Sequence, residues 1–255
     1  MKITFLGTGT STGVPQIGCS CKVCRSTDVR DKRLRTSLLV ETERTRILLD
    51  CGPDFRQQIL PCAFRRMDAV LLSHEHYDHV GGIDDLRPFG AFGDVHLYAA
   101  ERTGEQLRQS LPYCFVEHKY PGVPQLQLHA VRPHEMFRVG ELHVTPIEVM
   151  HARLPILGFR IDNMAYITDM KTIADGEIDY LQGLDLLVVN GLRHEPHYSH
   201  QTIEEACAFA RRLNVPYTYL VHMGHHIDVH AAEEASLPEG IHLGYDGLVV
   251  DTDRI

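Results

Sequence analysis

The decapeptide SHEHYDHVGG gathers four metal-capable side chains within six residues: His74, His76, Asp78 and His79. It directly follows an apolar run and ends in two glycines, which allow the chain to turn tightly. Imidazoles and carboxylates are ligands of Zn²⁺ and similar divalent ions. On one helix these spacings would point the side chains apart. We therefore expect a loop that wraps them around two ions, with His74 and His76 on one, and Asp78 and His79 on the other.

Four ligands do not complete two metal sites, and further candidates stand at the ends of other apolar runs. His151 follows LHVTPIEVM, Asp169 ends MAYITD, and His222 follows YTYLV. Asp50 has the same placement after RILL. Side chains at the ends of several strands can meet at one rim of a sheet. The sequence therefore predicts that these residues converge with the histidine-rich loop.

A second cluster lies near the N-terminus, where GCSCKVC holds Cys19, Cys21 and Cys24 in a chain of seven cysteines. An odd count and close spacing favour a metal site over a disulfide framework in a reducing compartment. His225, in LVHMGHHID, would complete a tetrahedral Cys3His site, a ligand set typical of structural zinc. His226 is the competing fourth ligand, and three reduced thiols without a metal are the remaining alternative.

Short apolar strands must position these side chains, and their Val, Ile, Leu, Thr and Tyr content suits a buried, pleated surface. The expected strands cover residues 2–7, 36–42, 46–52, 69–74, 142–150, 158–161, 164–169, 184–190 and 217–222. Asp162 and Asn163 separate two of these runs, so we expect a tight hairpin turn there.

The best-marked helix begins at Thr202. Thr202 and Glu205 form a capping box ahead of an amphipathic stretch in which Cys207 takes a core position. This start leaves His200 in the loop immediately before the helix. Weaker helix candidates cover residues 100–111 and 231–236.

The composition favours one domain over residues 1–255, because no Gly/Ser-rich or Pro-rich linker, charge block or repeat interrupts the chain. A net charge of −9 argues against a protein that grips nucleic-acid backbones over a wide face. It remains compatible with a small anionic substrate held by metal ions. The N-terminal run MKITFLGTGTSTG fits neither a signal peptide nor a membrane span, so we expect a cytoplasmic protein without membrane contact.

The motif HEHYDH, with its downstream histidine, aspartate and histidine, resembles the metallo-β-lactamase superfamily, whose signature is HxHxDH followed by His, Asp and His. This resemblance implies an α/β fold, an αββα sandwich with a dimetal site at the sheet rim. It implies that one ion is held by His74, His76 and His151, the other by Asp78, His79 and His222, and that Asp169 bridges them. Asp50 matches a family aspartate that orients a ligand histidine.

A closer resemblance rests on TFLGTGTSTGVPQIGCSCKVC, the Ser-His pair at 199–200, HMGHHID and GYDG. These stretches are similar to the phosphoribosyl cyclic phosphodiesterases of the phosphonate pathway and their relatives. The resemblance implies two divalent ions in the active site, one structural Zn²⁺, and a small cyclic or diester phosphate as substrate, such as a ribosyl 1,2-cyclic phosphate. Spacing leaves Zn²⁺ and Mn²⁺ both open for the active site. Relatives often pair, so a homodimer is a further expectation.

Roles follow from the same resemblance. His200 matches the family histidine that protonates the leaving group, and Asp78 and Asp169 are the carboxylates of the catalytic centre. An exposed loop histidine is the alternative for His200. Candidate substrate contacts lie in LRHEPHYSH, with a solvated basic loop as their alternative: Arg193, His194 and His197.

Two other functions stay open. A tRNA 3′-end endonuclease uses a similar metal set, although the acidic balance and the lack of an obvious basic tRNA-gripping arm weigh against it. A noncatalytic relative of the pyrroloquinoline quinone biosynthesis protein shares an N-terminal CxCxxC, but a complete ligand set favours catalysis. One departure from the relatives is Asn190, where they often carry an acidic residue. Its consequence for metal or substrate preference is open at this point.

Overall fold

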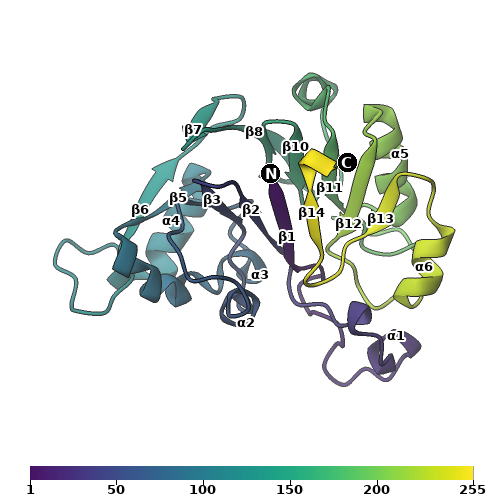
Figure 1. Cartoon of the computed structure of the whole chain (residues 1–255), viewed down its shortest axis with the longest axis horizontal. Helices are drawn as coiled ribbons and strands as arrows, with labels where there is room; N and C mark the ends of the chain where they lie inside the picture. The colour runs from purple at the N-terminus through teal and green to yellow at the C-terminus, as the bar shows by residue number, and fades with distance from the viewer. Residues whose placement is uncertain (255) are drawn as a thin grey trace.

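The computed structural model describes residues 1–254 and contains two mixed β-sheets packed face to face (Figure 1). The first sheet has the spatial order β14 (Val249–Asp251), β1 (Lys2–Gly7), β2 (Ser37–Glu41), β3 (Arg46–Leu49), β4 (Ala69–Leu71), β5 (Val95–Ala99) and β6 (Leu126–Ala130). The second sheet has the order β13 (Ile241–Leu243), β12 (Tyr217–Val221), β11 (Leu186–Asn190), β10 (Met164–Ile167), β9 (Leu154–Ile161), β8 (Leu142–His151) and β7 (Phe137–Val139).

Alternation along each strand divides the core into three layers. In β2, Leu38 and Val40 face the interior between the sheets, while Leu39 faces the outer helices. In the second sheet, Val188 points into the same interior and Leu187 points outward. The molecule is therefore the expected αββα sandwich, and its sheets are buried on both faces over much of their area.

Helical segments cover the outer faces of the sheets. Those over the first sheet are α2 (Phe55–Ile59), η2 (Ile83–Phe92) and α4 (Glu101–Ser110), and those over the second are η4 (Asp175–Leu181), α5 (Ile203–Leu213) and α6 (His230–Ser236). Shorter turns are α1 (Lys22–Arg25), η1 (Val29–Asp31), α3 (Tyr77–Val80), η3 (Pro112–Cys114) and η5 (Thr252–Arg254). Within the described range, no helix is long and apolar enough to cross a membrane.

Several local predictions are confirmed. The capping box forms, with Thr202 Oγ1 accepting from Glu205 N at 3.1 Å and Glu205 Oε2 accepting from Thr202 N at 2.9 Å. The β9–β10 hairpin turns at Asp162, which has a positive φ of 47°. Cys207 is buried as expected.

Other expectations were incomplete. The histidine-rich segment is not a loop throughout, because Asp78 and His79 lie in the one-turn helix α3 while His74 and His76 precede it. One turn is short enough that both side chains still face the centre. Sequence analysis also missed the strands β5, β6, β7, β13 and β14. Strands β7, β13 and β14 are only three residues long, and β6 (LQLHA) carries polar residues on a half-exposed edge. No strong apolar run therefore marks these four strands.

Candidate dimetal centre and cysteine cluster

Three candidate residues follow strands in an unusual backbone conformation. Asp50 after β3, Asp169 after β10 and His222 after β12 each have a φ of 57°. Left-handed backbone at a non-glycine residue is costly and clusters at functional sites. Here it turns the backbone sharply at each of the three strand ends, and the polar side chains therefore lie at one rim of the two packed sheets.

One half of the centre surrounds the carboxylate of Asp78. Its Oδ2 lies 3.1 Å from His79 Nε2 and 3.4 Å from His222 Nε2. The Oδ1 of Asp169 lies 3.3 Å from each of the same two nitrogens. All four side chains are buried, and their ligand atoms lie within 4.8 Å of one another.

The other half surrounds the second oxygen of Asp169. Its Oδ2 lies 3.9 Å from His74 Nε2 and 3.8 Å from His200 Nδ1. His76 Nδ1 is 2.9 Å from His74 Nε2, and the His151 ring packs against the rings of His76 and His200 at 5.2 and 4.8 Å. The structure thus brings all seven predicted ligands of the centre together, with Asp169 between the two groups.

Asp50 supports this centre from behind. Its carboxylate accepts hydrogen bonds from Ser73 N at 2.8 Å, Ser73 Oγ at 2.9 Å and Tyr166 Oη at 2.9 Å, and it lies 2.8 Å from His79 Nδ1. The last contact turns His79 Nε2 toward the centre. Tyr166 comes from the opposite sheet, and sequence analysis did not identify it, because a tyrosine inside an apolar run carries no local sign of a polar partner.

Asn190 holds the backbone next to Asp169. Its Oδ1 accepts from Met170 N at 2.7 Å, and its Nδ2 donates to Met170 O at 3.0 Å. The side chain is fully buried, and its amide supplies both the acceptor and the donor of this arrangement. Asn190 therefore has a structural role, which is to fix the turn that presents Asp169.

The electrostatics of the centre fit divalent cations. Burial disfavours a charged ring at His79, but the surrounding carboxylates, Asp169 first among them, outweigh burial and raise the pKa of this histidine well above its ordinary value. His79 Nε2 is buried and makes no hydrogen bond within residues 1–254. Converging carboxylates around a ring nitrogen are what a bound metal ion would satisfy, because the ion would take the place of the proton that these carboxylates favour on His79. How the ligands divide between two ions remains a prediction.

His200 is buried beside this centre, so the alternative of an exposed loop histidine is wrong. Its ring stacks on His222 at 4.8 Å. Burial, followed by the rings of His222 and His151, lowers the pKa of His200 to about 3, against the attraction of Asp169. Its Nδ1 has no hydrogen-bond partner in the described chain. His200 is therefore a neutral imidazole at neutral pH until a negatively charged group approaches it.

The three candidate substrate contacts separate in the structure. His194 is held by Glu204 at 2.6 Å and Glu233 at 3.0 Å, and these carboxylates raise its pKa. Arg193 donates to the backbone carbonyls of residues 195 and 196, so it shapes its own loop. His197 alone packs against the centre, with its ring 5.0 Å from His200.

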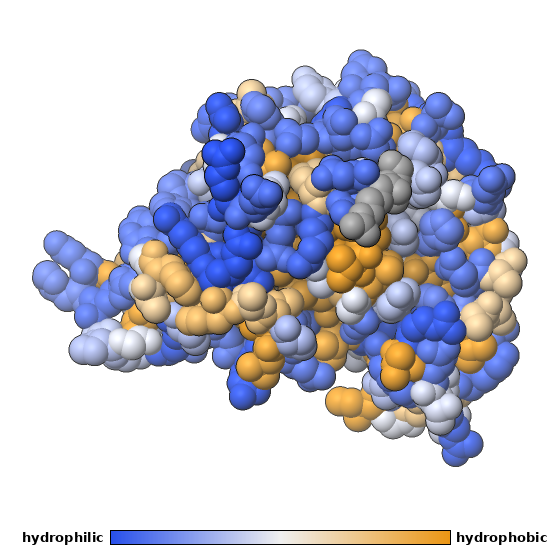
Figure 2. Space-filling view, viewed as in Figure 1, coloured by the Kyte–Doolittle hydropathy of each residue, from blue (hydrophilic) through white to orange (hydrophobic). Residues whose placement is uncertain are grey.

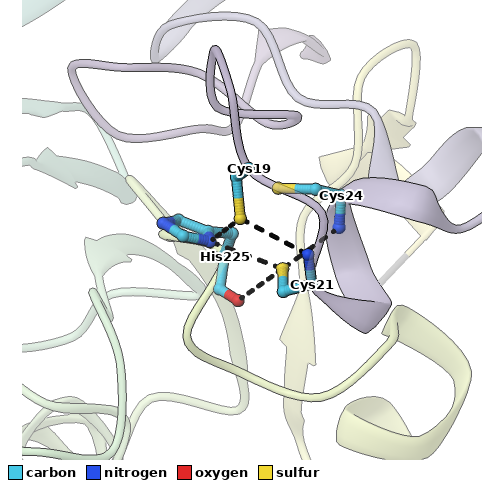
Figure 3. A group of neighbouring side chains, drawn as sticks. All are labelled: Cys19, Cys21, Cys24 and His225. Atoms are coloured by element: carbon cyan, nitrogen blue, oxygen red, sulfur yellow. Dashed lines mark hydrogen bonds between the residues drawn. The ribbon is translucent and has the colours of Figure 1, made fainter.

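The cysteine cluster forms at one end of the molecule, beside α1 (Figure 3). Cys19 Sγ lies 3.2 Å and Cys21 Sγ 3.5 Å from His225 Nδ1, and Cys24 completes a group whose ligand atoms lie within 4.8 Å of one another. The four side chains point toward one another, whereas His226 is not part of the group. A hydrogen bond from Cys24 N, opposed by burial and aided by His225, lowers the pKa of Cys21 to about 6. A thiolate at Cys21 suits a soft metal ion.

Comparison with known proteins agrees with this geometry. A family model described as "Beta-lactamase superfamily domain" matches residues 45–223. This range contains every candidate ligand of the dimetal centre and excludes the cysteine cluster. A diphosphatase of the PhnP family has a crystal structure with 37% sequence identity and a TM-score of 0.91, covering 98% of this chain and 96% of that one.

Two curated relatives carry different names. An octanoyltransferase of Porphyromonas gingivalis is 50% identical over 256 residues, covering all of this chain and 52% of the relative. A ribonuclease Z of Thermosynechococcus vestitus is 30% identical over 168 residues, covering 63% of this chain and 36% of the relative. The chain thus spans about half of the first relative and about a third of the second.

Proposed function

Because this chain belongs to the β-lactamase superfamily, as a metal-dependent hydrolase close to the PhnP family, we propose that it is a dinuclear phosphodiesterase that cleaves a small cyclic or diester phosphate. A ribosyl 1,2-cyclic phosphate is one such substrate. The observation that carries the proposal is the position of Asp169, whose two carboxylate oxygens face the two groups of histidines. Such a carboxylate is suited to bridging two ions.

Two divalent ions held there would lower the pKa of a water molecule and offset negative charge on a phosphate. The chain's own residues provide the orientation. Asp50 fixes His79, and Asn190 fixes the turn that carries Asp169. His151 Nδ1 donates to the carbonyl of Asp169 at 2.8 Å, which directs its Nε2 toward the rim. These contacts keep the ligands in place before any substrate arrives.

In this proposal His200 supplies the proton that the leaving group needs. Its low pKa in the free protein leaves it neutral, but an approaching phosphate adds negative charge beside the ring and favours its protonated form. A protonated His200 would then give its proton to the departing alkoxide oxygen. The position of His200, buried at the edge of the centre, supports this role.

The comparisons favour phosphate chemistry but do not decide which kind of phosphate bond is cleaved. The diphosphatase relative raises a second candidate, cleavage of a phosphoric anhydride by the same centre. A tRNA endonuclease is less well supported, because the net charge of −9 does not favour binding along an RNA backbone. The name octanoyltransferase belongs to a protein about twice as long, and the imidazoles and carboxylates of this centre are suited to hydrolysis.

The first experiment is a hydrolysis assay of the metal-replete protein on bis(p-nitrophenyl) phosphate, a five-membered cyclic sugar phosphate and a dinucleoside diphosphate. We expect Asp78→Ala to lower turnover at least about a thousand-fold, because it removes a ligand and unpairs His222 and His79. Asp175→Ala, an aspartate-to-alanine change at the surface, is the matched control. Preference for the cyclic phosphate supports the proposal, whereas preference for the diphosphate supports the second candidate. No turnover on any of the three, with both ions bound, would contradict both.

A second variant tests the role of His200. His200→Ala should retain both ions and lose about a hundred-fold or more in kcat on substrates with poor leaving groups, because these need the proton. The loss should be much smaller with p-nitrophenolate as the leaving group. Equal losses on both substrates would argue against proton donation and for a binding role.

A further inference from the structure

One predicted ligand of the dimetal centre lacks the support that its neighbours have. On the ring nitrogen that faces away from the centre, three histidines have a partner: His74 meets Ser73 Oγ at 3.0 Å, His79 meets Asp50 at 2.8 Å, and His151 meets the carbonyl of Asp169 at 2.8 Å. His222 lacks such a partner, but its ring is buried and stacks on the rings of His79 and His200. His76 lacks one as well within residues 1–254, and its side chain is exposed. The position of His76 therefore depends on the backbone that carries it.

This backbone is held on one side only. The carbonyl of His76 accepts from His79 N at 2.9 Å and from Val80 N at 3.2 Å, which ties it to the turn α3. On the N-terminal side, neither His74 nor Glu75 makes a backbone–backbone hydrogen bond within residues 1–254. The segment that joins the ligands His74 and His76 is thus without a backbone anchor.

The side chain of Glu75 supplies an anchor for this segment. Its Oε1 lies 2.7 Å from Arg102 Nε, and its Oε2 accepts from Thr103 Oγ1 at 3.1 Å. Both partners lie in the first turn of α4, where the N-cap residue Ala100 provides no side-chain cap. A carboxylate is favoured at this end of a helix, because the helix dipole is positive there.

The start of α4 is itself fixed beside the centre. Strands β4 and β5 are parallel, so the segment after β4 and the helix after β5 meet at the same edge of the first sheet. Leu107 of α4 is buried in the outer core layer. A Cβ added at Gly104 would lie 2.9 Å from Leu128 Cδ2, so the helix lies directly against β6. Glu75 therefore joins the two ligands to a well-packed element.

Burial distinguishes these contacts from ion pairs at the surface. Hydrophilic side chains cover much of the face seen in Figure 2, and ion pairs between exposed side chains contribute little in water. The Glu75 side chain is only 13% exposed, and Thr103 is 2% exposed. Arg102 is 63% exposed, so we expect the buried contact with Thr103 to contribute more than the ion pair does.

We propose that Glu75 is a positioning residue of the dimetal centre, which holds the His74–His76 segment against α4 so that both imidazoles stay in place for one ion. This inference rests on the proposed dinuclear centre. Glu75 itself contacts α4 and is not among the candidate ligands. Without it, the exposed ring of His76 would move with its backbone, and one ion would lose a ligand. The ligands of the other ion have their own support, so the loss should be selective.

The test is metal binding by the metal-replete full chain, measured as zinc retained against increasing concentrations of a chelator. Glu75→Ala should lower the affinity for one ion of the dimetal centre about ten- to a hundred-fold, as is typical when a partner behind a metal ligand is removed. The second ion and the zinc of the cysteine cluster should be retained. Glu105→Ala, at an exposed glutamate of the same helix, is the matched control and should bind zinc as the parent does.

Three further variants distinguish positioning from a general loss of stability. Thr103→Val keeps the shape of the buried side chain and removes its hydroxyl, and it should lower the affinity for the same ion more than Arg102→Ala does. Thr103→Val added to Glu75→Ala should cause no further loss, because the two residues act through one contact. Glu75→Gln keeps an acceptor for Thr103 and should recover part of the affinity. Visible absorption of the Co²⁺-loaded variants reports the ligands of the remaining ions, and circular dichroism confirms that each variant folds.

The outcomes separate this inference from the proposed function. Selective loss of one ion in Glu75→Ala, with the zinc of the cysteine cluster kept, supports the positioning role. Unchanged affinity for both ions overturns it, and so does an equal loss of all the metals, which would indicate general destabilisation. A parent protein that binds both ions but hydrolyses no phosphate substrate contradicts the proposed function alone. A parent that binds fewer than two ions at the centre overturns both.

Discussion

The dimetal centre and the cysteine cluster differ in how strongly the surrounding fold holds their ligands in place. Around the dimetal centre, five of the seven predicted ligands are buried, all except His76 and His151, and residues behind them such as Asp50 and Asn190 hold the site in place. In the cysteine cluster, only Cys24 is buried, and the supporting apolar contacts are few, centred on Val14 and Val23. The fold therefore arranges the first set of ligands in advance, whereas the second set depends on its ion to hold the loop together.

The two regions are joined by a short stretch of chain. His222 of the centre and His225 of the cluster are separated by Met223 and Gly224. Met223 N donates to Thr8 O at 3.0 Å, and Met223 O accepts from Thr10 N at 3.0 Å. The N-terminal loop thus pairs with the segment that carries ligands of both clusters, so loss of order in the cysteine loop can reach the dimetal centre.

The largest expected effect is on the cysteine cluster. Cys21→Ser removes a thiolate ligand and should lower the free energy of unfolding by about 3 kcal/mol, because the loop has little other support. The bound zinc should fall by one equivalent, as measured by elemental analysis beside thermal unfolding. Cys62→Ser, at a half-buried thiol outside the cluster, is the control, and this variant should keep the zinc of the cysteine cluster. Unchanged zinc content in Cys21→Ser would refute the metal site.

A smaller effect is expected behind the dimetal centre. Asn190→Asp removes the donor to Met170 O, which should cost about 1–3 kcal/mol of stability and loosen the turn at Asp169. Metal content of the centre should fall while the zinc of the cysteine cluster stays. Asn214→Asp, at the end of α5, is the matched control. If the cysteine cluster loses its zinc as well, a disturbance that begins at Asp169 spreads to the second region, and the contrast drawn above fails.

The smallest effect concerns the stem of the cysteine loop, where Arg33 Nη2 lies 3.2 Å from His230 Nδ1. Burial, then Arg33 and Arg30, lowers the pKa of His230 from 6.5 to about 4. Between these pH values the folded state binds fewer protons than the unfolded state, so stability is lost as the pH falls. We expect a loss of about 1 kcal/mol from pH 6.5 to 5 that disappears in His230→Asn but persists in His143→Asn, measured by urea unfolding. A loss of equal size in His230→Asn would assign the effect to other groups.

Local pattern was enough to predict much of the fold. Strong apolar runs marked most of the central strands, and the Thr202 capping box marked the start of α5, because these signals lie within a few residues of one another. The edge strands were missed since they are short or polar. The single domain, the homodimer and the cytoplasmic location stay predictions.

What the sequence by itself determined was the chemistry of the clusters. HxHxDH and CxCxxC name their ligand types through spacing alone, and the more distant ligands were found by their positions after apolar runs and by resemblance. Tertiary structure decided which neighbours those residues meet. It placed His225 rather than His226 among the thiols, engaged His194 with two glutamates, and put Tyr166 and Asn190 behind the centre. These contacts join residues from distant parts of the chain, so no local spacing encodes them; they exist only once the two sheets have packed.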